Sequence, residues 1–143
     1  MQAARTREEL WSVTGAWRRD GARVALVPTM GNLHEGHLAL VHAARQHADR
    51  VVTSIFVNPT QFGAGEDFQS YPRTLDADRC KLEEAGCDLA FVPDEPTMYP
   101  SGLKDAVRLS AAPSLANILE GASRPGHFDG VVKAVFSSAD LGD

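Results

Sequence analysis

The stretch that decides the fold is Pro28-Thr29-Met30-Gly31-Asn32-Leu33-His34-Glu35-Gly36-His37, which follows an apolar run at 23–27. The apolar run predicts a short buried strand, ended by Pro28. The helical pattern that begins at His37 and continues to about residue 48 predicts a helix directly after the stretch. The stretch therefore joins a strand to a helix N-terminus, where backbone N–H groups and the helix dipole favour an anion.

Two histidines in this stretch are candidates for chemistry. His34 and His37 are spaced so that both can face one side of the first helical turn. Beside an anion-binding terminus they could donate hydrogen bonds to the charge that develops on an attacked phosphate, while Gly31 and Gly36 would let the backbone approach a ligand. The alternatives are a capping or surface role for each histidine, and a zinc site. The zinc pattern His-Glu-x-x-His would need histidine at Leu38, so no bound metal is predicted.

Helices and strands alternate along the rest of the chain. The predicted strands lie at 23–27, 51–57, 88–92 and 106–109, and the predicted helices at 6–21, 37–48, 74–86, 113–119 and from 131 onward. A capping box, Thr6-Arg7-Glu8-Glu9, marks the first helix. This alternation predicts an α/β fold with a Rossmann-like, doubly wound parallel sheet. Ligands bind such sheets beyond the carboxyl ends of the strands, so the site is expected in the loops 28–36, 58–73 and 93–104.

Composition narrows the classes of function. The 143 residues fit one domain, and 14 Lys and Arg against 19 Asp and Glu give a net charge of −5. This acidic balance argues against nucleic acid and against an anionic membrane surface as partners. No apolar stretch has the length of a membrane span, and the N-terminus has no apolar signal core, so a cytoplasmic protein is predicted. Cys80 and Cys87 are predicted to be two buried or partly buried thiols.

A family resemblance becomes specific when the motifs are taken together. The His-x-Gly-His element at 34–37 resembles the signature of the nucleotidylyltransferase superfamily of α/β folds. Five segments, in the family's order, resemble pantothenate synthetases (pantoate–β-alanine ligases): PTMGNLHEGHL (28–38), SIFVNPxQF (54–62), YPRT (71–74), MYP (98–100) and LEGASRPGHFxGV (119–131). The combination is far more specific than the histidine element alone.

The resemblance implies an ATP-dependent, AMP-forming ligase. ATP and pantoate would form pantoyl adenylate and pyrophosphate, and β-alanine would then attack the adenylate to give pantothenate and AMP. His37 and His34 would be catalytic, against the phosphates, and Mg²⁺ would accompany the nucleotide. Gln61 and Asn58 would bind pantoate and β-alanine, although Asn58 has an alternative role as the cap of a turn. The implied ATP-binding residues are Met30, Gly31, Asn32, Leu33, His34, Glu35, Gly36 and His37.

The resemblance also carries expectations about the extent of the chain. Relatives continue into a second domain, so residues 1–143 are expected to be the N-terminal nucleotide- and pantoate-binding domain, truncated and with the C-terminal domain absent, and weak or inactive alone. The full-length form is expected to be a homodimer. The segment 63–73 is expected to be a lid that excludes water or a mobile surface loop. Glu120, Arg124 and His127 are expected to serve in an internal pair or an interface.

Two other functions remain open from the sequence. One is a non-catalytic domain that binds nucleotide or pairs with another subunit. The other is a small-molecule adenylyl- or cytidylyltransferase with a different acceptor, against which the Asn58-Pro59-x-Gln61-Phe62 segment argues.

Overall fold

A parallel sheet is the centre of the fold. The computed structural model describes residues 1–103. Their strands are β1 (Gln2–Ala4), β2 (Val24–Thr29), β3 (Arg50–Ile55) and β4 (Leu89–Phe91), in the order β1-β4-β3-β2 with every pairing parallel. The predicted parallel sheet is therefore confirmed. The strand expected at 106–109, the helices expected at 113–119 and from 131, and Glu120, Arg124 and His127 lie outside the described residues.

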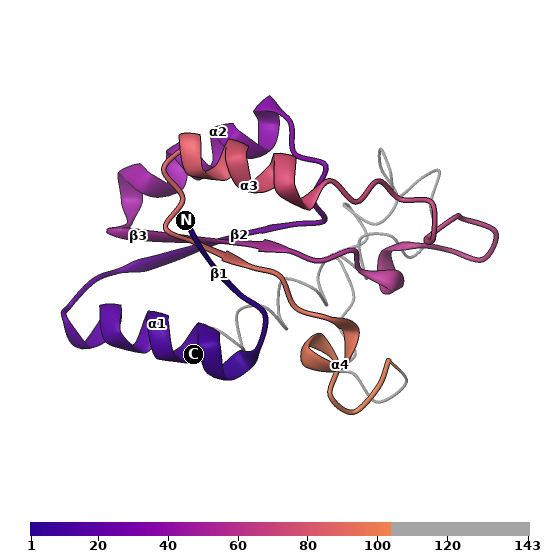
Figure 1. The fold of residues 1–143 in the computed structure, drawn as a ribbon, viewed down its shortest axis with the longest axis horizontal. Helices are drawn as coiled ribbons and strands as arrows, with labels where there is room; N and C mark the ends of the chain where they lie inside the picture. Colours follow the sequence, from indigo (N-terminus) through magenta and orange to yellow (C-terminus); the bar gives the residue numbers. More distant parts are fainter. Residues whose placement is uncertain (104–143) are drawn as a thin grey trace, which may run out of the picture.

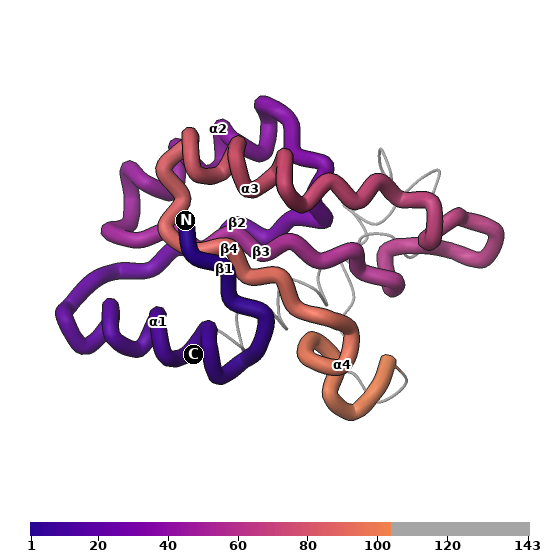
Figure 2. The backbone as a smooth tube through the Cα atoms, in the orientation of Figure 1, coloured from indigo at the N-terminus to yellow at the C-terminus, as the bar shows by residue number. Residues whose placement is uncertain are grey.

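Helices cover both faces of the sheet, which confirms the doubly wound arrangement (Figure 1). Helix α1 (Arg7–Arg19) lies on one face, and α2 (Glu35–His47) and α3 (Leu75–Glu84) lie together on the other. The segment between β3 and α3 extends beyond the sheet (Figure 2) and includes the short 3-10 helix η1 (Pro59–Gln61). A four-residue helix, α4 (Glu95–Met98), follows β4.

Each face of the sheet has its own core. Leu10 on α1 packs with Phe91 and Val52 of the sheet, while Val41 on α2 and Leu82 on α3 pack on the opposite face. The predicted capping box starts α1 as expected, because Thr6 Oγ1 accepts a hydrogen bond from the Glu9 N–H and the Glu9 carboxylate accepts one from the Thr6 N–H, both at 3.2 Å. None of the helices within 1–103 is long and apolar enough to cross a bilayer.

The structure corrects several boundaries. Strand β2 does not end at Pro28 but pairs with β3 through Thr29. Pro28 is tolerated because β2 stands last in the strand order of residues 1–103, where a missing backbone N–H need not break a ladder. Helix α2 begins at Glu35, two residues before the predicted start at His37, because His34 is its N-cap. Strand β1 and helix α4 were not predicted at all.

The prediction of two buried or partly buried thiols is confirmed for Cys87 and wrong for Cys80. Cys87 is buried, and its thiol contacts the Thr53 hydroxyl at 3.2 Å, but Cys80 on α3 is exposed. Cys80 points away from the core because Leu82, on the same helix, occupies the face that packs on the sheet.

Candidate functional site

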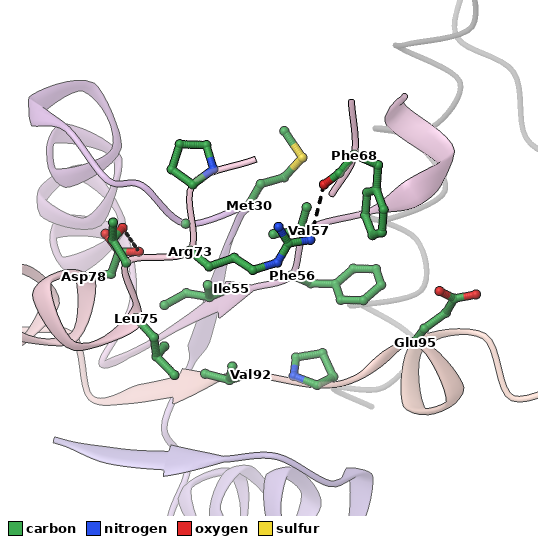
Figure 3. Close-up of a pocket in the computed structure, with 14 residues that line it drawn as sticks. Met30, Ile55, Phe56, Val57, Phe68, Arg73, Leu75, Asp78, Val92 and Glu95 are labelled. Atoms are coloured by element: carbon green, nitrogen blue, oxygen red, sulfur yellow. Dashed lines mark hydrogen bonds between the residues drawn. The ribbon is translucent and has the colours of Figure 1, made fainter. Parts of the chain in front are cut away.

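A cavity of about 320 Å³ lies at the carboxyl edge of the sheet. Its wall takes residues from the segments that follow β2, β3 and β4, and Figure 3 shows them converging. Met30, Val57 and Pro93 represent the three segments. This is the position predicted from the topology, because parallel strands end at one edge and their following loops meet there.

The turn after β2 has a backbone that only a few residue types adopt. Gly31 has φ +81° and Asn32 has φ +51°. A Cβ at Gly31 would lie 3.0 Å from Asp78 Oδ2 and 3.1 Å from Ile55 Cγ2. Glycine is therefore required at residue 31 both by conformation and by the closeness of α3.

Helix α3 holds this turn through a buried carboxylate. Asp78, 1% exposed, accepts hydrogen bonds from the backbone N–H groups of Asn32 at 2.9 Å and Leu33 at 2.8 Å. One turn along α3, the Lys81 ammonium donates to the Leu33 carbonyl at 2.7 Å. Thr74 is the N-cap of α3 but makes no capping hydrogen bond with its side chain, and its hydroxyl instead donates to Asp78 at 3.1 Å. Neither Asp78 nor Lys81 was among the site residues predicted from the sequence.

Both imidazoles accept hydrogen bonds from backbone N–H groups at the start of α2. His34, the N-cap of α2, accepts the Gly36 N–H at Nδ1 (3.0 Å), and the His34 N–H donates to His37 Nδ1 (3.2 Å). The ring centroids are 4.1 Å apart. Because both Nδ1 atoms accept, each neutral ring carries its proton on Nε2. Gly36 makes room for this arrangement, since a Cβ there would lie 2.8 Å from His34 Cε1.

The backbone donors of this segment are largely committed within the protein. The Gly31 N–H donates to Thr29 Oγ1 at 3.2 Å, and those of Asn32 and Leu33 donate to Asp78. Those of His34 and Gly36 donate to the imidazoles. These five N–H groups of the loop already have acceptors within the protein, so the expectation that such groups would bind the anion does not extend to them. The Nε2–H groups of His34 and His37 are the side-chain donors that this helix terminus offers instead.

Burial lowers the pKa of His37 below its ordinary value of 6.5. The neighbouring His34 lowers the pKa further, and the carboxylate of Asp78 opposes both effects. His37 is therefore a neutral imidazole at neutral pH, with Nε2–H as a hydrogen-bond donor.

This pKa shift makes stability depend on pH with a definite sign. Above about pH 6.5 the residue is neutral in both folded and unfolded chains and contributes no pH dependence. As the pH falls below that value the unfolded chain takes up the proton first, so folding stability is lost down to the lower pKa of the folded state. We expect His37→Asn to lose less unfolding free energy than the wild type between about pH 7.5 and about pH 5, measured by urea denaturation.

The matched control is His42→Asn, an exposed histidine on the same helix. This variant removes an imidazole from α2 and leaves the His34–His37 pair in place, so it shows what the loss of a histidine alone does to stability. If His37→Asn and the wild type lost equal unfolding free energy as the pH falls, the pKa of His37 would not be lowered in the folded chain.

A second polar cluster follows β3. Asn58, fully buried, accepts the Thr60 N–H at Oδ1 (3.2 Å) and so caps η1. Its Nδ2 donates to Gln61 Oε1 at 3.1 Å, and Gln61 is 8% exposed. The capping alternative for Asn58 is thus confirmed, and its contact with a ligand remains a prediction.

The segment 63–73 is folded around a guanidinium group. Arg73 donates to the carbonyls of Phe68 (3.3 Å), Gln69 (3.1 Å) and Tyr71 (2.8 Å), and it lies over the Phe68 ring at 5.3 Å. Phe62 makes edge contacts with the rings of Phe68 and Tyr71. Arg73 and Phe68 face the cavity (Figure 3), so this segment forms one of its walls. Sequence reasoning assigned Arg73 no individual role.

The predicted site residues fall into three places. Met30 and Gly31 line the cavity, with Asn32 and Leu33 held beside them by Asp78. The first turn of α2 carries His34, Glu35, Gly36 and His37. Asn58 and Gln61 form the separate buried cluster after β3. Within 1–103, His, Cys, Asp and Glu nowhere gather in a group of three or more that could hold a metal ion.

Within residues 1–103, the all-parallel order, the helices on both faces and the cavity at the carboxyl edge define a Rossmann-like α/β domain. A family model described as pantoate-beta-alanine ligase matches residues 2–138. The chain therefore belongs to the pantoate–β-alanine ligase family, as the sequence motifs predicted.

Curated relatives and solved structures agree with this assignment. The pantothenate synthetase of Xanthomonas campestris pv. campestris is 62% identical over 123 residues, which are 86% of this chain and 43% of that protein. The Stenotrophomonas maltophilia pantothenate synthetase is 61% identical over 119 residues, 83% and 42% of the two chains. This chain thus spans less than half the length of these relatives.

Two crystal structures of the family have the same fold. The pantothenate synthetase of Thermus thermophilus matches with a TM-score of 0.82 and 48% identity, over 99% of this chain and 49% of that one. The Francisella tularensis ligase, complexed with beta-gamma ATP and beta-alanine, matches with a TM-score of 0.85 and 38% identity, over 99% and 53%.

Proposed function

We propose that this chain supplies the nucleotide- and pantoate-binding site of an ATP-dependent pantoate–β-alanine ligase. The observation that carries the proposal is the pair of imidazoles at the start of α2, whose Nδ1 atoms are occupied and whose Nε2–H groups remain as donors. They follow the strand whose next residues, Met30 and Gly31, line the cavity. Membership of the family supports the same assignment.

The first step would form an adenylate. A carboxylate oxygen of pantoate bonds to the α-phosphorus of ATP, and the bond from that phosphorus to the bridging oxygen breaks, which releases pyrophosphate. Negative charge grows on the α-phosphate oxygens, where Nε2–H of His37 and of His34 would donate. Because both rings are held by backbone hydrogen bonds, little reorganisation is needed at the moment of reaction.

The second step would transfer the acyl group. The amine of β-alanine attacks the acyl carbon of pantoyl adenylate, the bond to the AMP oxygen breaks, and the amine loses a proton. Gln61, whose amide oxygen accepts a hydrogen bond from Asn58 Nδ2, would bind pantoate and reach β-alanine. The wall formed by 63–73 would serve as the lid that protects the adenylate from water.

The setting of the reaction is part of the same proposal. Mg²⁺ would accompany the ATP phosphates, as the nucleotide's own counterion. A cytoplasmic location and a homodimeric full-length form would fit a biosynthetic ligase of this family.

The test combines binding with turnover. Calorimetry of the purified chain should show binding of ATP and of pantoate, and with β-alanine present the products to follow are pyrophosphate, AMP and pantothenate. Binding of ATP without pantoate would support a nucleotide-binding domain alone, and transfer to another acceptor would support a different nucleotidylyltransferase. Binding of neither would refute the proposal. A pantothenate rate near that of a full-length relative would contradict the expectation that the chain is weak alone.

A further inference from the structure

The Met-Tyr-Pro segment at 98–100 belongs to the family resemblance, but the proposed chemistry gives it no role. Its tyrosine, Tyr99, directly follows α4 and is 4% exposed. The ring packs against Phe56 with the centroids 6.1 Å apart, and the hydroxyl donates to Asn58 Oδ1 at 2.9 Å. A residue from the segment after β4 therefore touches the polar cluster after β3.

The hydrogen bonds around Asn58 fix which end of its amide is which. The Thr60 N–H (3.2 Å), the Thr60 hydroxyl (2.8 Å) and the Tyr99 hydroxyl (2.9 Å) all meet the same atom of Asn58. An atom that meets an N–H donor and two hydroxyls is the amide oxygen, so the NH₂ end of Asn58 faces Gln61. Burial raises the pKa of Tyr99, while hydrogen bonding with Thr60 and Asn58 opposes the rise, so the phenol stays protonated at neutral pH.

The orientation passes on to the next amide. Asn58 Nδ2 donates to Gln61 Oε1 at 3.1 Å, so the carbonyl end of the Gln61 amide is turned toward Asn58. The NH₂ end of Gln61 then lies on the opposite side of the amide group. If Asn58 turned over, its oxygen would face the oxygen of Gln61, and the Gln61 amide would turn over as well.

We propose that Tyr99 is a positioning residue which, through Asn58, orients the Gln61 amide so that its NH₂ end meets a carboxylate or hydroxyl oxygen of the substrate acid. The part of the inference that concerns substrate rests on the proposed function. The orientation itself rests on the hydrogen bonds that join Asn58 to Thr60, Tyr99 and Gln61.

The test variant is Tyr99→Phe, which removes one hydroxyl and keeps the ring against Phe56. Thr14→Val is the matched control, because Thr14 is also buried and donates one 2.9 Å hydrogen bond, to the Leu10 carbonyl on α1. In calorimetry, Tyr99→Phe should raise the Kd for pantoate about tenfold and leave the Kd for ATP within about twofold of the wild type. Thr14→Val should change neither Kd.

A second readout needs no substrate. In ¹⁵N–¹H spectra of the ligand-free chain, Tyr99→Phe should shift the side-chain amide signals of Asn58 and Gln61 and speed their hydrogen exchange about tenfold, whereas Thr14→Val should not. Unchanged amide signals would overturn the proposal that Tyr99 orients the Gln61 amide through Asn58. Changed signals with an unchanged pantoate Kd would overturn its role in substrate binding.

The two readouts also separate this inference from the proposed function. If the wild-type chain binds no pantoate, the proposed function fails, while the amide spectra still decide whether Tyr99 orients Gln61.

Discussion

Replacing His37 with asparagine is expected to slow pyrophosphate release from ATP and pantoate by about 10²–10³, with the fold retained. Asparagine offers Oδ1 close to the position of Nδ1, so it can still accept the His34 N–H that His37 accepts at 3.2 Å. Nothing in asparagine replaces Nε2–H, so the donor to the α-phosphate is lost. Single-turnover measurements with the chain in excess over ATP make slow adenylate formation measurable.

The complementary variant is His37→Gln, whose longer side chain can bring an NH₂ group near the position of Nε2 but cannot keep the backbone contact. It should retain more of the adenylation rate than His37→Asn. His42→Asn, on the exposed face of α2, controls for loss of an imidazole in general and should react at the wild-type rate. A His37→Asn rate within about threefold of the wild type, in a folded chain, would refute the role given to His37.

The strands and helices nearest the site could be predicted because their signals are local. The apolar run before Pro28 and the spacing of Leu38 and Val41 specify a strand and a helix within a few residues. Strand β1 could not be predicted, because its three residues, Gln2–Ala4, carry no strand pattern and pair with β4, far along the chain.

At the site, too, features with a local sequence signal could be predicted, and features that depend on contacts in the folded chain could not. His34 and His37 stand out by spacing and by their place after a strand. What they present to a ligand could not be predicted, because the backbone hydrogen bonds of the folded turn decide which ring nitrogens remain as donors. Asp78 and Tyr99 were missed as site residues because their partners lie 45 and 46 residues away for Asp78 and 41 for Tyr99. An acidic residue on the core-facing side of a helix is the one sequence signal that could have pointed to Asp78.

Asp78→Asn is expected to lower the free energy of unfolding by about 2–3 kcal/mol. The amide oxygen of asparagine can accept only one of the two backbone N–H groups that Asp78 holds at 2.9 and 2.8 Å, and its NH₂ group would face the other. The N–H of Leu33 or of Asn32 then has a donor opposite it instead of an acceptor. Urea denaturation measures the loss as a shift in midpoint at an unchanged slope.

The consequence for ligand binding follows from the position of the turn. Asn32 and Leu33 stand between Gly31, on the cavity wall, and His34, so releasing them displaces both parts of the proposed ATP site. The ATP affinity measured by calorimetry should therefore fall about tenfold or more in a chain that is still folded.

Asp76→Asn is the control that separates the two hydrogen bonds from the turn to Asp78 from the general effect of a negative charge near a helix start. Asp76 lies in the first turn of the same helix but is exposed, so its loss should cost no more than about 0.5 kcal/mol and should leave ATP affinity unchanged. If the two variants lost similar stability, the hydrogen bonds from Asp78 to the turn would contribute little beyond the helix dipole. If Asp78→Asn lost stability but kept full ATP affinity, the turn would hold its shape without the carboxylate. The hydrogen bonds to Asp78 would then contribute to folding and not to ATP binding.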